Sequence, residues 1–173
     1  MATPRRRSIS RCRETEPLDS RAARVAALDA LARRDHSSEE LRRKLLEWGY
    51  DSTVVGRLIE QLCAEKLLDD RRYLENFVSY HAARGRGPEW VRAQLRKLGL
   101  QGPQVDSSLD AYPDWIVQLQ RARQKKFGTS LPSNYADRQR QARFLGYRGF
   151  TGAQIRTALG FDTDLDVDTK EEL

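Results

Sequence analysis

The sequence predicts an all-α protein made of three tandem three-helix repeats, resembling helix-turn-helix units, that form an elongated, curved array. Gly49, Gly99 and Gly149 recur at a spacing of 50 residues, and apolar residues around them follow the helical period. No alternating apolar and polar run bounded by turn residues suggests a strand. A unit of about 50 residues buries its own apolar faces poorly, so we expect stacking of neighbouring repeats to complete the core.

The first repeat is assigned to residues 19–68, beginning with a helix over about 20–34. Ser37 to Glu40 have the pattern of a capping box, which marks the start of the second helix. Cys63 follows Ile59 by four residues, so we expect it to be a small buried hydrophobe. The apolar positions expected in the core recur at helical spacing: Val25, Leu28, Leu31, Leu41, Leu45, Trp48, Val55, Ile59 and Leu62.

The second repeat is assigned to residues 69–112, where Asp69 and Asp70 favour a helix start because acidic side chains stabilise a helix N-terminus. Gly85-Arg86-Gly87 predicts a tight turn between helices. Pro88 and Pro103 each follow a glycine and suit a first helical turn. Trp90 occupies the position of Glu40 and is interpreted as an inter-repeat contact or as an anchor for a partner. The expected apolar positions are Tyr73, Phe77, His81, Val91, Leu95, Leu98, Val105, Leu109 and Tyr112.

The third repeat, residues 113–160, has a more polar central helix than the other two. Gln141 stands where the earlier repeats have Leu41 and Val91, and Arg148 stands where they have Trp48 and Leu98. This replacement of part of the apolar stripe suggests a surface offered to an anion. Thr151 to Gln154 predict a capping box, and the apolar positions are Ile116, Leu119, Phe127, Ile155 and Leu159.

Charge is distributed unevenly along the chain, whose formal net charge is +6. Residues 1–18 carry five Arg and two Glu and are expected to form a flexible basic arm. Residues 161–173 carry six acidic side chains and Lys170 and are expected to form an acidic disordered tail. Residues 113–159 contain nine basic side chains but only Asp114 and Asp137, so the third repeat should generate a positive potential.

The sequence offers no catalytic or metal-binding pattern. There is no Walker-type loop, zinc-ligand spacing or nucleophile elbow, and His36 and His81 are 45 residues apart without a second cysteine near either. We therefore expect no enzyme activity, no metal and no cofactor. Two cysteines do not indicate a disulfide framework, which favours the cytoplasm, and no apolar stretch is long enough for a membrane span.

Basic side chains of the second and third repeats are the candidate binding residues for a partner or for DNA. We expect them to attract phosphates or an acidic protein surface. They are Arg71, Arg72, Arg84, Arg86, Lys125, Lys126, Arg138, Arg140, Arg143 and Arg148.

Several motifs resemble the RecX family of bacterial regulatory proteins. They are SEELRRKL from Ser38 to Leu45, LLDDRRY from Leu67 to Tyr73, RGRGP from Arg84 to Pro88, KFG from Lys126 to Gly128, and RFL followed by RGF within Arg143 to Phe150. In this order they form a specific combination, and the resemblance covers about residues 19–160.

The resemblance implies a modular repeat protein that binds the RecA recombinase and lodges in the groove of the RecA-DNA filament. Such a protein usually inhibits strand exchange, ATP hydrolysis and coprotease activity, which connects it with DNA recombination, DNA repair and the SOS response. No cofactor is implied, and we expect a monomer that binds RecA and, more weakly, DNA itself. By position, Asp69 to Tyr73 correspond to the family's most recognisable motif, whose residues contact RecA or fix the repeat.

A second hypothesis is a direct DNA-binding protein of the helix-turn-helix type, because a three-helix unit can hold that motif and the third repeat is basic. It predicts tight, salt-sensitive binding to duplex DNA without a partner. A hydrolase or nuclease lacks a metal or nucleophile constellation in this sequence.

Overall fold

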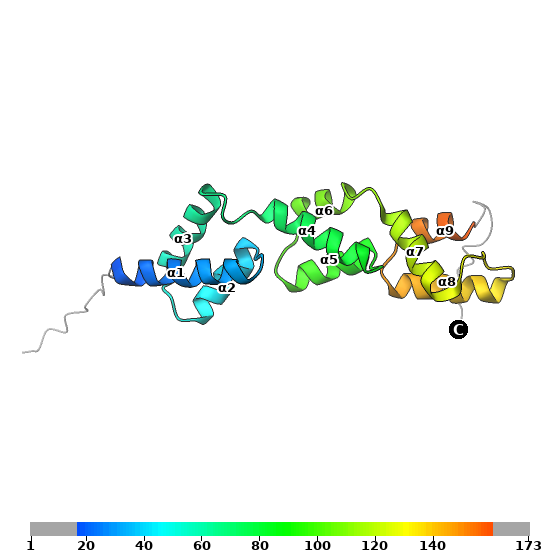
Figure 1. Ribbon diagram of the computed structural model, residues 1–173, viewed down its shortest axis with the longest axis horizontal. Helices are drawn as coiled ribbons and strands as arrows, with labels where there is room; N and C mark the ends of the chain where they lie inside the picture. The colour runs from blue at the N-terminus through cyan, green and yellow to red at the C-terminus, as the bar shows by residue number, and fades with distance from the viewer. Residues whose placement is uncertain (1–16, 161–173) are drawn as a thin grey trace, which may run out of the picture. The chain divides into compact units, whose positions relative to one another are not determined.

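The computed structural model describes residues 17–160, and this part of the chain contains helices and turns but no strand (Figure 1). The all-α prediction is therefore confirmed. The predicted basic arm and acidic tail lie outside the described residues, except that the first helix already begins at Pro17. The helices are α1 (Pro17–Arg33), α2 (Ser38–Glu47), α3 (Ser52–Ala64), α4 (Asp70–Ala83), α5 (Pro88–Lys97), α6 (Pro103–Asp110), α7 (Trp115–Phe127), α8 (Tyr135–Tyr147) and α9 (Gly152–Leu159).

The helices pack in groups of three, as the repeat predicts. Helices α1, α2 and α3 contact one another, as do α4, α5 and α6, and likewise α7, α8 and α9. The described part of the chain divides into two compact units, with the boundary between Asp69 and Asp70. The second unit holds two of the three-helix groups, which are joined through contacts between α4 and α7.

The glycines, prolines and capping residues that the sequence predicts at helix ends stand at the ends of these helices. Gly49, Gly99 and Gly149 have φ values of 90°, 85° and 85°, the left-handed conformation that suits glycine after a helix. Pro88 and Pro103 stand in the first turns of α5 and α6. Thr151 forms a complete capping box with Gln154 at the start of α9.

At the start of α2 the capping box is only half formed. The Ser37 side chain accepts a hydrogen bond from the Glu40 amide, but the Glu40 carboxylate pairs with Arg34 and lies 3.2 Å from Nδ1 of His36. His36 is buried between α1 and α2, in the structural role that its sequence suggests. A nearby arginine has therefore drawn the capping carboxylate toward α1.

The apolar face of α1 differs from the prediction. Alanines 23, 27 and 30 are buried, whereas Val25 is 55% exposed and Leu28 is 36% exposed. Expecting Val25 and Leu28 in the core is therefore wrong, and Leu31 is only partly buried. The three alanines and the three predicted apolar residues both recur at helical spacing. The alanines are the buried set because their small side chains allow α1 to approach α2 and α3 closely. The core of this unit also contains Leu41, Leu45, Val55, Leu58, Ile59, Leu62 and Leu68.

Two further core predictions for the first repeat are also wrong. Trp48 is 50% exposed at the end of α2, where the Lys44 ammonium lies 5.2 Å from the ring centre. Cys63 is exposed because eight residues advance a helix by about 80° beyond two full turns, which carries it away from the buried face at Val55. Leu62, seven residues after Val55, stays on that face and is buried.

The core of the second unit runs through both of its repeats. It contains Tyr73, Leu74, Val78, Ala82, Val91, Leu95, Val105, Leu109, Trp115, Leu119, Leu145, Phe150, Ile155, Ala158 and Leu159, with the partly buried Phe77, Trp90, Leu100, Tyr112, Ala122, Ala142 and Phe144 around them. Residues of both three-helix groups thus share one apolar cluster, which confirms that stacking completes the core of this unit.

Gln141 and Arg123 form a polar centre inside the third repeat. Gln141 is 4% exposed and Arg123 is 3% exposed, which corrects the expectation that Gln141 turns a former core position into surface. The Arg123 guanidinium donates to the carbonyls of Ser130 (2.9 Å) and Thr129 (3.1 Å) and approaches Gln141 Oε1 at 3.5 Å. Gln141 therefore keeps the buried position of Leu41 and Val91 and supports an arginine that holds the loop before α8.

Candidate anion-binding groove

A cavity of about 470 Å³ lies between the end of α4 and helices α7 and α8. Half of its lining residues are basic and none is acidic, so it suits an anion. We call it the basic groove; its lining residues are Ala83, Arg84, Gly85, Gln118, Arg121, Ala122, Lys125, Lys126, Phe144 and Arg148.

Helix α7 supplies three of the five cations because of its residue spacing. Arg121 and Lys125 are four residues apart and therefore lie on the same face of the helix, with Lys126 beside them. Lys125 and Lys126 also stand in the last turn of α7, where positive side chains interact favourably with the helix dipole. The local structure thus tolerates this concentration of charge without requiring a carboxylate.

An aromatic ring orients two of the cations. The Lys126 ammonium lies 4.3 Å from the centre of the Phe144 ring, and the Arg148 guanidinium lies 5.0 Å from the same centre. Such cation–π contacts hold a side chain in place without neutralising its charge. The positive charge in the groove therefore stays available to a ligand.

Carboxylates do not neutralise the groove within residues 17–160. None of Arg84, Arg121, Lys125, Lys126 and Arg148 forms an ion pair with an Asp or Glu in this range. Elsewhere in the same unit Arg71 pairs with Glu75 at 2.9 Å and Arg140 pairs with Asp137 at 3.0 Å. The groove is therefore the place where described basic side chains gather without local acidic partners.

The Gly85-Arg86-Gly87 turn holds the two walls of the groove together. The Gly87 amide donates to the Arg148 carbonyl (2.8 Å), and the Glu89 amide donates to the Gly149 carbonyl (3.0 Å). The Arg148 guanidinium in turn donates to the Arg84 carbonyl (3.3 Å). These bonds join the second repeat directly to the end of α8, so the predicted turn also acts as a docking element.

Glycine is required at this joint for close backbone approach. A Cβ atom on Gly87 would lie 2.3 Å from backbone atoms of Gly149 and Phe150, and one on Gly149 would lie 2.4 Å from Trp90. Trp90 is thus an inter-repeat contact, one of the two roles weighed for it. A side chain at either glycine would force the repeats apart and change the shape of the groove.

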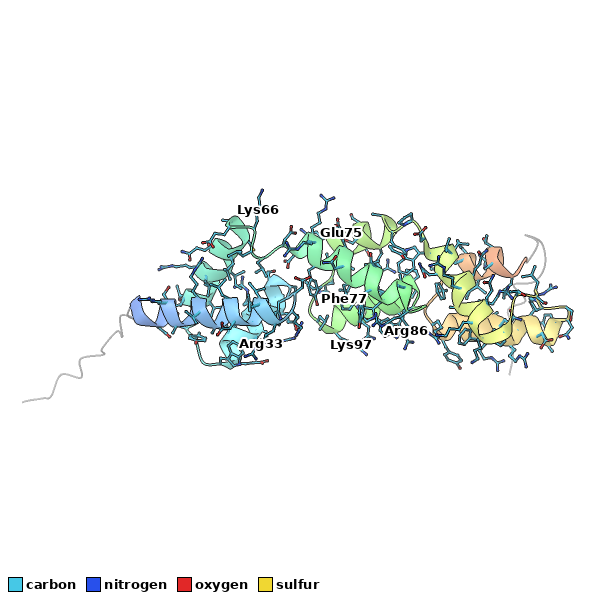
Figure 2. The ribbon with its side chains drawn as sticks, in the orientation of Figure 1. Arg33, Lys66, Glu75, Phe77, Arg86 and Lys97 are labelled. Atoms are coloured by element: carbon cyan, nitrogen blue, oxygen red, sulfur yellow. The ribbon has the colours of Figure 1, made fainter. Side chains whose placement is uncertain are left out.

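An aromatic cluster borders the groove at the end of α4. The Arg84 guanidinium lies 3.5 Å from the ring centre of Tyr80, which is 54% exposed, and the Arg86 guanidinium lies 4.5 Å from that of Trp90. His81 packs between these rings; burial, and then the charges of Arg84 and Arg86, lower its pKa. Figure 2 shows Arg86 on the side of its repeat that is nearer to α7 and α8.

The structure brings together only some of the predicted binding residues. Arg84, Lys125, Lys126 and Arg148 line the groove, and Arg86 lies in the adjoining turn. The other predicted residues do not line it: Arg71, Arg72, Arg138, Arg140 and Arg143.

Three of these outlying residues have other surroundings in the structure. Arg71 and Arg72 start α4, about 20 Å along the helix from Arg84. Arg71 lines a separate cavity of about 520 Å³ beside Glu75. Asp70 is the first residue of α4, as the helix-start interpretation predicts. Arg140 stays near Phe127, at 5.6 Å from the ring centre.

Arg121 is the groove residue that the sequence prediction missed. Its spacing of four residues from Lys125 on a predicted helix is the signal that could have identified it.

Neither a metal site nor a membrane span is evident in the described residues. No group of three or more His, Cys, Asp or Glu side chains within 17–160 is placed to hold a metal ion. Across that same range, no helix has the length and apolar character needed to cross a membrane.

Comparison with known proteins identifies relatives across most of the chain. The family model for the first three-helix domain of RecX matches residues 23–62, and that for the third three-helix domain matches residues 116–159. Regulatory protein RecX of Halorhodospira halophila is 41% identical over 140 residues, which are 80% of this chain and 87% of the relative. Regulatory protein RecX of Pseudomonas fluorescens is 41% identical over 145 residues, which are 83% and 94% of the two chains.

A solved structure has the same fold. The crystal structure of RecX from Lactobacillus salivarius aligns with a TM-score of 0.73 at 20% identity, covering 84% of this chain and 97% of that one. From the sequence relatives and the domain matches together, the chain belongs to the RecX family of regulatory proteins.

Proposed function

We propose that this RecX-family chain binds the RecA-DNA filament and inhibits its recombinase, ATPase and coprotease activities. It acts as a monomer in the cytoplasm, in DNA recombination, DNA repair and the SOS response, and performs no chemistry of its own. The basic groove faces an anionic part of the filament, either DNA phosphates or an acidic protein surface. Family membership supports the regulatory role, and the groove supports the anionic target.

The observation that carries the proposal is a groove with five cations and no described carboxylate paired with them. Arginine guanidinium groups can donate two parallel hydrogen bonds to a phosphate, while lysine ammonium groups act as point charges. The backbone bonds between Gly87 and Arg148 and between Glu89 and Gly149 keep the two walls in a fixed arrangement. A preformed groove loses less entropy on binding than cations on separate flexible side chains.

The other candidate cations have secondary roles in this proposal. Arg86, Arg138, Arg140 and Arg143 extend the positive surface on the same two repeats. Arg71 and Arg72, at the start of α4, form a separate contact with the filament. Both residues belong to the family motif from Asp69 to Tyr73.

Steady-state ATP hydrolysis by RecA on single-stranded DNA, with this protein titrated in, tests the function. A parallel titration measures binding to the same DNA without RecA. Inhibition at concentrations that leave bare DNA unbound supports a filament regulator. Unchanged hydrolysis, or inhibition that only follows coating of the DNA, contradicts it and favours the alternative, a direct DNA-binding protein of the helix-turn-helix type.

Charge reversal tests whether the basic groove is responsible. Lys125→Glu with Lys126→Glu should abolish most of the inhibition. The matched control is Arg96→Glu with Lys97→Glu, which changes two adjacent exposed basic residues in the last turn of α5 by the same total charge. Both double substitutions place two negative charges in the last turn of a helix, so both interact unfavourably with the helix dipole. Equal loss of inhibition in the two variants would show that overall charge matters and the groove does not.

A further inference from the structure

The segment that follows α9 has a charge opposite to that of the basic groove. Residues 161–173 contain four Asp and two Glu, with Lys170 as their only basic residue. We propose that this acidic segment binds in the basic groove of the same chain and competes there with the anionic partner. The inference rests on the proposed function, because it concerns the regulation of the same groove.

The segment starts close enough to reach the groove. It follows Gly160 at the end of α9, and α9 packs against α7 and α8. Three of the five groove cations lie on α7, and a fourth, Arg148, directly follows α8. Thirteen extended residues span up to about 43 Å. Helix α7, which carries three of the five groove cations, is about 20 Å long, so the extended segment is longer than this helix.

The spacing of the acidic residues in the segment suits a row of cations. Aspartate occupies every second position from 162 to 168, and Phe161, Leu165 and Val167 stand among the intervening positions. In an extended backbone, alternate side chains project to one side at about 6.6 Å intervals. In that conformation the segment would present a row of carboxylates to Arg121, Lys125 and their neighbours.

Covalent attachment makes even a weak contact effective. A short flexible tether gives an effective concentration in the millimolar range. An intrinsic dissociation constant of about 1 mM therefore leaves the groove occupied in about half of the molecules. The contact is electrostatic, so salt should release the segment.

Zero-length cross-linking with a carbodiimide tests the contact in the full chain without RecA or DNA. The reagent joins a carboxylate to a lysine amine that it touches, and mass spectrometry identifies the pairs. Cross-links from residues 162–172 to Lys125 or Lys126 should exceed those to Lys97, an exposed lysine of the same unit, and should disappear at about 1 M salt. Equal cross-linking to Lys97 and to the groove lysines would overturn the proposal.

Amidation of the acidic residues tests the competition. In the full chain with Asp162, Asp164, Asp166 and Asp168 changed to Asn, and Glu171 and Glu172 changed to Gln, affinity for single-stranded DNA at low salt should rise. If the segment fills the groove in about half of the molecules, as estimated above, the dissociation constant falls about twofold. This gain should vanish in the Lys125→Glu, Lys126→Glu background. An unchanged dissociation constant would contradict competition.

The cross-linking assay and the inhibition assay on the Lys125→Glu, Lys126→Glu variant together separate this inference from the proposed function. Groove cross-links together with normal filament inhibition by the Lys125→Glu, Lys126→Glu variant would overturn the proposed role of the groove but support binding of the segment. Loss of inhibition in that variant without groove cross-links would overturn only the binding of the segment.

Discussion

The first and third repeats place their basic side chains in different surroundings. In the first repeat Arg24 pairs with Glu65, Arg34 with Glu40, and Arg42 and Arg43 with acidic residues on α2 itself. In the third repeat Lys126 and Arg148 lie against Phe144, and Arg123 is buried among backbone carbonyls. The same three-helix architecture therefore carries two arrangements of charge. In the first repeat these arginines are neutralised by nearby acidic residues, whereas in the third repeat Lys126 and Arg148 keep their positive charge.

The comparison shows that one helical framework can carry two different arrangements of charged side chains. Both repeats end their central helix with a left-handed glycine and bury a leucine at the matching positions Leu45 and Leu145. They differ in the partners of their cations and in how closely the glycine is packed. The first three predictions below each change one of these differences, and the fourth concerns a buried histidine that the third repeat lacks.

The largest effect is expected at the packed glycine. Gly149→Ala combines an unfavourable positive φ with a collision at Trp90, so we expect a loss of about 2–5 kcal/mol in the free energy of unfolding. Gly49→Ala has a similar φ but nothing within 4 Å of the new Cβ and should lose about 1–2 kcal/mol. Denaturant unfolding measures both losses, and hydrogen exchange assigns them to helices. Equal losses would show that Gly149 has no role in docking.

A smaller loss is expected from removing the buried arginine of the third repeat. Arg123→Met leaves the carbonyls of Ser130 and Thr129 without their donor, which should cost about 2–4 kcal/mol of stability. Arg121→Met, two residues earlier on the exposed side of α7, should change stability by less than about 0.5 kcal/mol but weaken DNA binding. The two variants should therefore separate in thermal unfolding and in binding titrations. Similar unfolding temperatures would contradict a structural role for Arg123.

Neutralising one groove cation should change how binding depends on salt. Lys125→Gln should reduce the slope of log affinity for single-stranded DNA against log salt by about 1, because one phosphate contact is lost. Arg43→Gln in the first repeat should leave the slope unchanged, since Arg43 lies 3.9 Å from Glu47. Fluorescence anisotropy over a salt series provides both slopes. The groove assignment fails if both substitutions lower the slope equally.

The smallest effect concerns pH and the first repeat. Burial, followed by the charge of Arg34, lowers the pKa of His36 below its ordinary value of 6.5, and Lys44 acts in the same direction while Glu40 opposes it. The unfolded chain therefore binds this proton more readily, so stability present above pH 6.5 decreases as the pH falls below it. The third repeat contains no histidine.

Hydrogen exchange at about pH 7.5 and about pH 5.5, corrected for intrinsic rates, should show destabilisation of α1–α3 and little change in α8 and α9. His36→Gln should reduce the pH effect on α1–α3. Loss of protection in α8 and α9 of equal size would contradict the assignment to His36.

The sequence by itself determined the helical repeats. Apolar spacing, the glycines at 50-residue intervals, the N-terminal prolines and the Thr151 capping box all depend on interactions within a few residues, and the structure has each of them. The family resemblance was also available from local motifs such as RGRGP, and related chains confirm it.

The tertiary structure alone decided which faces are buried and which cations meet. Helical spacing gives the angle of a side chain around its own axis but does not identify the neighbouring helix, so α1 could bury alanines in place of Val25 and Leu28. The same reason placed Gln141 in the core and Trp48 at the surface. Arg84 and Arg148 are 64 residues apart in the sequence but lie together in the groove. They meet because Gly87 and Gly149 have no side chains, which lets the backbones of the two repeats pack closely.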